Sequence, residues 1–286
     1  MGFYLLSVAL LHVPAVQRGV TFLISEALKD ILHTELSIGR VDLGYFNRII
    51  LDDVRIKDQK KKDLLKAARL SAKIELTSLL HGKISISNVQ LYGFDIRLYQ
   101  RTQKEKPNFQ FLIDTFAKKD SLPSNPNLRI NSVLIRRGKL SWHRYDKSPT
   151  PGRFNSDHIV LDKISATLSL KSYTVDSLNL NVKKFSFEEH SGLQLKQLSF
   201  KITANREKAQ LDHFTIELPH SRLALHPVTM SYRHIKEGNG KGRYQDFTFQ
   251  GSIEQGTFSF ADFIPFYPKS VQNHVLAVSY THLTLP

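Results

Sequence analysis

Residues 84–91 read ISISNVQL, and the same pattern recurs as LRINSVLI at residues 128–135 and as LQLKQLSF at residues 193–200. Apolar and polar residues alternate in each segment, but one apolar step spans three residues instead of two. In the first segment this step lies between Ile86 and Val89. Side chains of a strand alternate between two faces, so a step of three needs a bulge or tight bend to keep the apolar residues on one face.

The other two segments place the step between Ile130 and Val133 and between Leu195 and Leu198, and plain alternation runs through most of the chain from Glu35 onward. A strand unit with one apolar face cannot bury that face alone, and stacking many such units side by side makes a long sheet. We therefore expect a mainly β fold. It consists of an N-terminal transmembrane or amphipathic helix, an elongated, curved antiparallel sheet of degenerate repeats that forms an open groove, and one or two short helices.

The chain opens with residues that carry no charge until Arg18. A membrane-spanning helix needs roughly 20 apolar residues and usually has basic residues at its cytoplasmic end. No small-residue cleavage site follows, which argues against a secretory signal. We interpret residues 1–16 as part of a transmembrane anchor whose beginning is missing. The residues assigned to it are Phe3, Tyr4, Leu5, Leu6, Val8, Leu10, Leu11 and Val13.

Helical spacing of apolar residues marks three further segments. Residues 17–33 are predicted to form an amphipathic helix, and residues 108–118 a short helix with Pro107 and Asn108 at its start. Residues 259–275 contain two prolines and predict a broken helix.

The Pro, Ser and Asn cluster at residues 121–127 is the best candidate for a domain boundary. It separates a β module at residues 34–120 from a β-repeat groove segment at residues 127–277. The last nine residues, VSYTHLTLP (278–286), coincide with one reading frame of a common transposase-type sequencing adaptor. We expect these residues to be an artefact and the natural chain to continue beyond about Ala277.

The charge balance favours no single partner. Forty Lys and Arg outnumber 26 Asp and Glu, giving a net charge of +14. Such an excess raises the question of nucleic acid or acidic lipid, but here it is densest in segments that read as loops. Cysteine is absent, which excludes disulfides and thiolate metal sites.

The sequence contains no motif that predicts catalysis. It lacks HExxH, Walker-type, dinucleotide-binding and GxSxG patterns, and the glycine-rich residues 238–243 are interpreted as a hairpin loop. Asp52 and Asp53 are adjacent in a strand and so point to opposite faces, while His143 and His220 are expected at the surface or a sheet edge. We therefore expect no enzyme activity, no catalytic residue, no metal site and no cofactor.

Several segments, in this order and spacing, resemble the N-terminal part of TamB-like proteins of the AsmA superfamily, in particular the branch of Bacteroidetes-type Gram-negative bacteria. They are HVPAVQ (12–17), ELSIGRVDLGYFNRIILDDVRIKD (35–58), LLKAARLSAKIELTSLLHGKISISNVQLYGFDIRLYQ (64–100), NFQFLIDTF (108–116), LRINSVLIRRGKLSW (128–142) and GLQLKQLSFKITANREKAQLDHFTIELPHSRL (192–223). The resemblance covers nearly all of residues 1–277.

The resemblance implies an inner-membrane anchor, a periplasmic β-groove with an apolar lining, and no catalytic centre. It further implies phospholipid transport between the inner and outer membranes, a role in outer-membrane protein assembly and secretion, and a partner of the Omp85 type, a barrel-assembly protein. The alternating apolar residues are the expected lining for acyl chains. These residues are Ile84, Ile86, Val89, Leu91, Phe94, Ile96, Leu98, Leu178, Leu180, Phe185, Phe187, Leu195, Leu198, Phe200 and Ile202.

Two other functions remain open. The same sheet could be a scaffold that binds an outer-membrane barrel partner by adding a strand at its edge, without carrying lipid. A basic β domain that binds nucleic acid is the less favoured alternative, and we expect no nucleic-acid partner. For the apolar residues themselves, the simpler interpretation is a core packed against a covering helix such as residues 20–32.

Overall fold

A computed structural model describes residues 32–44, 48–74, 86–117, 130–174, 177–236, 242–272 and 283–285, together with Gly19, Phe22 and Glu26. The chain divides into two compact units. The first comprises Met1–Ser124, Val133–Pro149 and Asn155–Lys163, and the second comprises Asn125–Ser132, Thr150–Phe154 and Ile164–Pro286. The predicted anchor at residues 1–16, the boundary at residues 121–127 and most of residues 17–33 lie outside the described residues.

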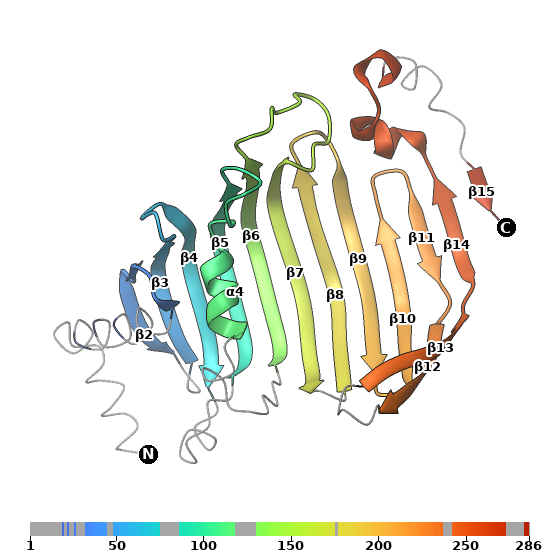
Figure 1. Ribbon diagram of the computed structural model, residues 1–286, viewed down its shortest axis with the longest axis horizontal. Coiled ribbons are helices and arrows are strands. Elements are labelled where there is room, and N and C mark those ends of the chain that lie inside the picture. The colour runs from blue at the N-terminus through green and yellow to red at the C-terminus, as the bar shows by residue number, and fades with distance from the viewer. Residues whose placement is uncertain are drawn as a thin grey trace. The chain divides into compact units, whose positions relative to one another are not determined.

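Figure 1 shows that strands dominate both units. The first unit contains β1 (Leu36–Ser37), β2 (Arg40–Gly44), β3 (Arg48–Lys57), β4 (Asp63–Ile74), β5 (Ile86–Gln100), helix α4 (Gln110–Ala117) and most of β6 (Ile130–Arg144). Strand β7 (His158–Thr174) begins in the first unit and ends in the second.

The second unit continues with β8 (Ser177–Glu189), β9 (Gln194–Ala204), β10 (Lys208–Glu217), β11 (Arg222–Leu225), β12 (Val228–Lys236), β13 (Gly242–Gln250) and β14 (Ile253–Phe258). The 3₁₀ helix η1 (Phe260–Phe266) and the short strand β15 (Leu283–Leu285) follow.

The fifteen described strands belong to one sheet with the order β1-β3-β4-β5-β6-β7-β8-β9-β10-β11-β14-β15, in which β2 also pairs with β3 and β12 pairs with β10 and β13. Every pair whose register is described is antiparallel. The order has two different ends, so the described sheet is open. The mainly β, antiparallel and open character predicted from the sequence is confirmed.

Strands β11 and β12 act as one interrupted strand, because both pair with β10 in a single continuous register. Strands β14 and β13 pair with β11 and β12 respectively, each with one register shift. The antiparallel pairing of β12 with β13 confirms the hairpin predicted around residues 238–243.

Two of the three predicted steps coincide with irregular pairing. In β5, Asn88 and Ile86 pair with the adjacent residues Lys73 and Ile74, so Ser87 is an extra residue. In β9, Leu198 and Leu195 pair with Phe185 and Phe187, so β9 contains one residue more than β8 over this stretch. These bulges keep the apolar residues on one face, as the sequence predicted. The register around Ile130 and Val133 is not described.

Residues with left-handed backbone conformation accompany the same three-residue step in further strands. Six strands each contain one residue in the left-handed region, with φ between +52° and +59°. These residues are Asp53, Gly93, Arg137, Lys163, His213 and Asp246. Each one lies between two apolar or aromatic positions, or a glycine, that are three residues apart, as Gly93 does between Leu91 and Phe94. His213 and Asp246 lie at register shifts in the pairing, which are bulges that reset the alternation. Asp53 and Gly93 lie where the pairing of β3, β4 and β5 continues without a shift.

Both predicted interior helices are present. Helix α4 confirms the helix expected within residues 108–118. The Asn108 side chain, just before this helix, accepts a hydrogen bond from the Tyr99 amide (2.9 Å) and donates to the Arg97 carbonyl (3.0 Å). Asn108 thus ties the chain to β5.

The broken helix predicted at residues 259–275 is confirmed. Ser259 caps η1 by accepting a hydrogen bond from the Ala261 amide, and extended Tyr267 ends it. A second helical segment begins at residue 269. Among the described residues, no helix has both the length and the apolar character needed to cross a membrane.

Candidate functional site

The candidate site is one face of the sheet in the second unit. Directly paired residues of antiparallel strands point to the same face. Leu180 of β8 pairs with Ile202 of β9, and Ile202 pairs with Leu211 of β10. Leu211 then pairs with Val228 of β12. This row is apolar across four strands.

The neighbouring rows of paired residues along the same strands are also apolar. The central strand β9 alternates regularly from Leu198 to Ala204, so the rows that it carries share one face. We define the apolar face by the members of these rows, which are Leu178, Leu180, Val182, Phe185, Phe187, Leu195, Leu198, Phe200, Ile202, Ala204, Ala209, Leu211, Ile216, Leu223, Val228, Met230 and Phe249.

Most of the apolar face is half-buried. Val182 and Leu195 are nearly covered, Phe249 is 70% exposed, and the other members lie between these limits. The extensive contacts of β8, β9 and β10 with other described elements are contacts with neighbouring strands of the sheet. A second packed layer would bury most of these side chains, so their neighbours shield them only from the sides.

Helix η1 lies at the end of this part of the sheet. It contacts the strand turns, since Asp262 accepts hydrogen bonds from the His220 amide and a Cβ on Gly192 would lie 3.7 Å from Pro265. Phe266 packs against Phe154 with ring centroids 4.9 Å apart. These contacts place η1 at the turns.

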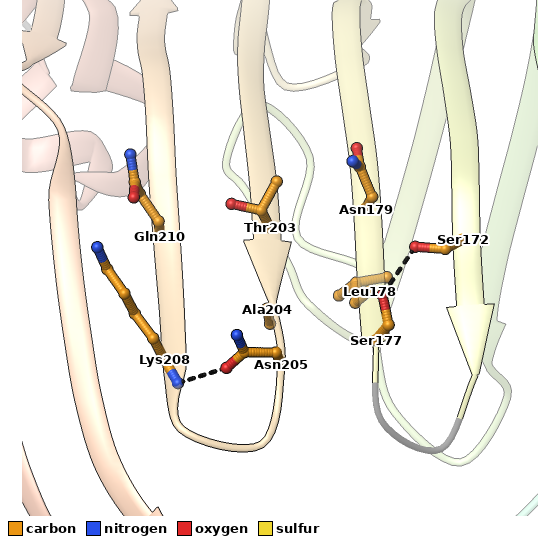
Figure 2. Close-up of a pocket in the computed structure, with 9 residues that line it drawn as sticks. All are labelled: Ser172, Ser177, Leu178, Asn179, Thr203, Ala204, Asn205, Lys208 and Gln210. Atoms are coloured by element: carbon orange, nitrogen blue, oxygen red, sulfur yellow. Dashed lines mark hydrogen bonds between the residues drawn. The ribbon is translucent and has the colours of Figure 1, made fainter.

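Polar residues occupy the opposite face. Asn179, Thr203 and Gln210 are paired across β8, β9 and β10. Figure 2 shows these three side chains beside a shallow hollow near the β9–β10 turn, with a volume of about 260 Å³. In that turn the Asn205 side chain accepts a hydrogen bond from the Lys208 amide (2.8 Å). Strands β8, β9 and β10 therefore have an apolar side and a polar side.

The first unit repeats the arrangement in β3, β4 and β5. Four rows of three paired residues are apolar throughout. These rows are Ile49, Ala72 and Val89; Leu51, Leu70 and Leu91; Val54, Ala67 and Phe94; and Ile56, Leu65 and Ile96. These rows are more fully buried than the apolar face of the second unit, because Leu51, Val54, Ala67 and Phe94 are all buried.

Phe94 is held by a glycine on the next strand of the order. The Phe94 ring covers Gly138 of β6 so closely that a Cβ at Gly138 would lie 2.1 Å from the ring's Cζ. Phe94 is 5% exposed. A residue without a side chain on β6 thus provides the space for the ring.

The predicted lining residues fall into four groups. Ile84 lies outside the described residues, and Ile86 pairs through its backbone with Ile74. Phe94 and Leu195 are buried. The rest are half-buried, namely Val89, Leu91, Ile96, Leu98, Leu178, Leu180, Phe185, Phe187, Leu198, Phe200 and Ile202. The predicted membrane-anchor residues lie outside the described part of the chain.

The prediction from the sequence did not include several members of the apolar face. Val182, Leu211 and Ile216 complete its rows, and their signal was the same alternation in β8 and β10. Asp52 and Asp53 do not form an acid pair. The Arg69 guanidinium donates to Asp52, with a distance of 2.7 Å from Nε to Oδ1.

A polar network fixes the loop end of β5. The buried Asp58 carboxylate accepts hydrogen bonds from the Tyr99 hydroxyl (2.7 Å) and from the amides of Lys60 and Lys62. Burial, followed by the adjacent Asp58 carboxylate, raises the pKa of Tyr99 to about 12. A carboxylate with this many donors is a structural turn element.

Two histidines that were predicted at the surface or a sheet edge have close polar partners. His143 is half-buried, with its Nδ1 3.2 Å from Nδ1 of His158. Burial, and secondly the nearby His158, lowers the pKa of His143. His220 is exposed as predicted, but its Nδ1 lies 3.0 Å from the buried Asp262 carboxylate. In the described part of the chain, no three His, Asp or Glu side chains gather into a metal-binding cluster.

No protein-family model matches this chain, and no curated protein matches it.

Proposed function

We propose that this chain is the N-terminal part of a TamB-like, membrane-anchored periplasmic protein. On this proposal its apolar face carries phospholipid acyl chains between the inner and outer membranes and serves outer-membrane protein assembly and secretion. The single observation that supports it best is the apolar face itself, a contiguous set of half-exposed Leu, Ile, Val and Phe side chains. Large exposed apolar surfaces in folded proteins mark interaction sites for apolar partners.

The proposed mechanism needs no chemical step. An acyl chain lying along the rows of the apolar face leaves water and gains roughly 0.8 kcal/mol for each sheltered methylene group. Rows of similar composition follow one another along the strand direction and from strand to strand. A chain can therefore move from one row to the next with little change in free energy, while its head group stays in water.

A scaffold function is the second candidate. Strand β13 pairs only with β12 among the described elements, and its Phe247 and Phe249 are 56% and 70% exposed. A strand with a free edge and exposed aromatic residues can accept a strand from a partner. In this alternative a barrel-assembly protein binds the edge and no lipid lies on the apolar face.

The two functions are distinguished by charged substitutions on opposite faces of β8. Leu180→Glu introduces a carboxylate into the apolar face, whereas Asn181→Glu introduces the same group next to it on the polar face. Lipid transport predicts that Leu180→Glu abolishes phospholipid co-purification and complementation of an outer-membrane defect, while Asn181→Glu retains both. Retention of bound lipid in Leu180→Glu together with loss of partner binding would support the scaffold instead.

A further inference from the structure

The end of β6 and the beginning of β7 bring two imidazoles together in the first unit. The Nδ1 atoms of His143 and His158 are 3.2 Å apart, with ring centroids 5.4 Å apart and an angle of 42° between the ring planes. His143 is the second-last residue of β6, and His158 is the first residue of β7. The pair therefore joins the two ends of the connection between these strands.

The tautomer of His158 follows from its other ring nitrogen. His158 Nε2 lies 2.8 Å from the carbonyl oxygen of Lys147. A carbonyl only accepts hydrogen bonds, so Nε2 carries the proton, and in the neutral ring the lone pair is on Nδ1. This Nδ1 is the atom that faces His143. Metal-binding histidines are oriented in the same way, because they donate their second ring N–H to a carbonyl or carboxylate.

His143 supplies the matching nitrogen. Its Nδ1 faces Nδ1 of His158 across 3.2 Å. Two imidazoles that bind one ion at about 2.05 Å with a tetrahedral angle have nitrogens about 3.3 Å apart. The observed 3.2 Å between the two Nδ1 atoms is close to this spacing.

The nearby carboxylates already have partners. Arg144 donates to Asp146 (Nη2 to Oδ2, 3.1 Å) and to Asp157 (Nη1 to Oδ1, 3.2 Å). Tyr145 stacks on His143 with ring centroids 6.5 Å apart. A bound ion would thus have two imidazole ligands and complete its coordination with water. Imidazole ligands select ions such as Cu²⁺ and Zn²⁺ over Mg²⁺ and Ca²⁺.

We propose that His143 and His158 form a binding site for a divalent transition-metal ion, Cu²⁺ or Zn²⁺, which clips the end of β6 to the start of β7. This site is independent of the proposed lipid function, because it uses no residue of the apolar face. The competing arrangement is a direct hydrogen bond from the His143 Nδ1–H to His158, with no affinity for metal.

Copper binding tests the proposal. The full 286-residue chain, purified in mild detergent without a histidine tag, is titrated with Cu²⁺ and followed by electron paramagnetic resonance. The expected spectrum shows one tight site with two nitrogen ligands. His143→Asn and His158→Asn should each weaken this site by more than roughly tenfold, while the control His226→Asn, at an exposed position, binds like the wild type.

Zn²⁺ provides a second readout that does not depend on how well the variants fold. It should raise the midpoint of thermal unfolding of the wild-type chain, whereas Mg²⁺ and Ca²⁺ should leave that midpoint unchanged. A wild-type chain without a two-nitrogen Cu²⁺ site, or with no Zn²⁺-dependent shift, would establish the direct hydrogen bond and overturn the proposal. Equal Cu²⁺ affinity in His143→Asn and the wild type would also overturn it.

Discussion

Replacing Gly138 by alanine puts a methyl group where the ring of Phe94 already lies. The added Cβ would be 2.1 Å from Cζ, 2.2 Å from Cε1 and 2.9 Å from Cε2 of that ring. Ordinary carbon contacts are about 3.5–4.0 Å, so the ring has to move by about 1.5 Å. Phe94 is 5% exposed and has little free space to move into. We therefore expect Gly138→Ala to destabilise the first unit by about 1–3 kcal/mol, the usual cost of overpacking.

A double-mutant cycle separates this clash from other effects of alanine. Phe94→Ala alone should cost about 3–5 kcal/mol, as for other buried phenylalanines. Once the ring is absent, the methyl group at Gly138 has space, and the second substitution should cost less than about 0.5 kcal/mol. The two costs are therefore expected to sum to more than the cost of the double variant.

The chain contains a convenient probe for this measurement. Trp142 is the single tryptophan and lies on β6, the strand that carries Gly138. Its ring centroid is 6.2 Å from that of Phe109, next to α4. Urea unfolding followed by tryptophan fluorescence thus reports on the first unit. A neutral Gly138→Ala variant, or costs that add within about 0.3 kcal/mol, would refute the packing of Phe94 over Gly138.

Two further predictions concern backbone conformation and ionisation. Gly93 has φ +59°, and a Cβ there would lie 3.1 Å from Cβ of Ala68, so Gly93→Ala should lower urea stability by about 1–2 kcal/mol; His213→Gly at φ +53° is the matched control and should not lower it. The raised pKa of Tyr99, about 12 against an ordinary value of 10, favours the folded state below pH 10 and predicts a loss of stability as pH rises from 10 to 12. Tyr99→Phe should remove this alkaline phase in pH-dependent unfolding, and an unchanged profile would contradict the Asp58–Tyr99 contact.

The sequence predicts the strand character and the single apolar face because both depend on local alternation. The bulges between Ile86 and Val89 and between Leu195 and Leu198 were predicted for this reason, since a step of three within a strand returns to the same face only through an extra residue. Arg137 and Lys163 were missed because neither residue type favours positive φ. Each of these positions lies within a step of three residues in the sequence pattern, as the two predicted bulges do.

Contacts between distant residues could not be predicted in this way. Phe94 meets Gly138, and His143 meets His158, only because the strand order and register place them together. None of these four residues indicates by its type which residue it will contact. A shift of one residue in the strand pairing would turn each side chain to the other face of the sheet. The apolar face could therefore be assigned from the sequence as a property of single strands, whereas its rows required the pairing of β8, β9 and β10.

Photo-crosslinking at adjacent positions of β9 tests whether phospholipid lies on the apolar face. A photoreactive amino acid placed at Phe200 lies on the apolar face, and the same amino acid at Lys201 lies on the polar face. The proposed lipid path predicts that, after irradiation in living cells, phospholipid is attached at position 200 and is absent at position 201. Equal labelling at both positions, or protein crosslinks without lipid at position 200, would rule out the proposed lipid path.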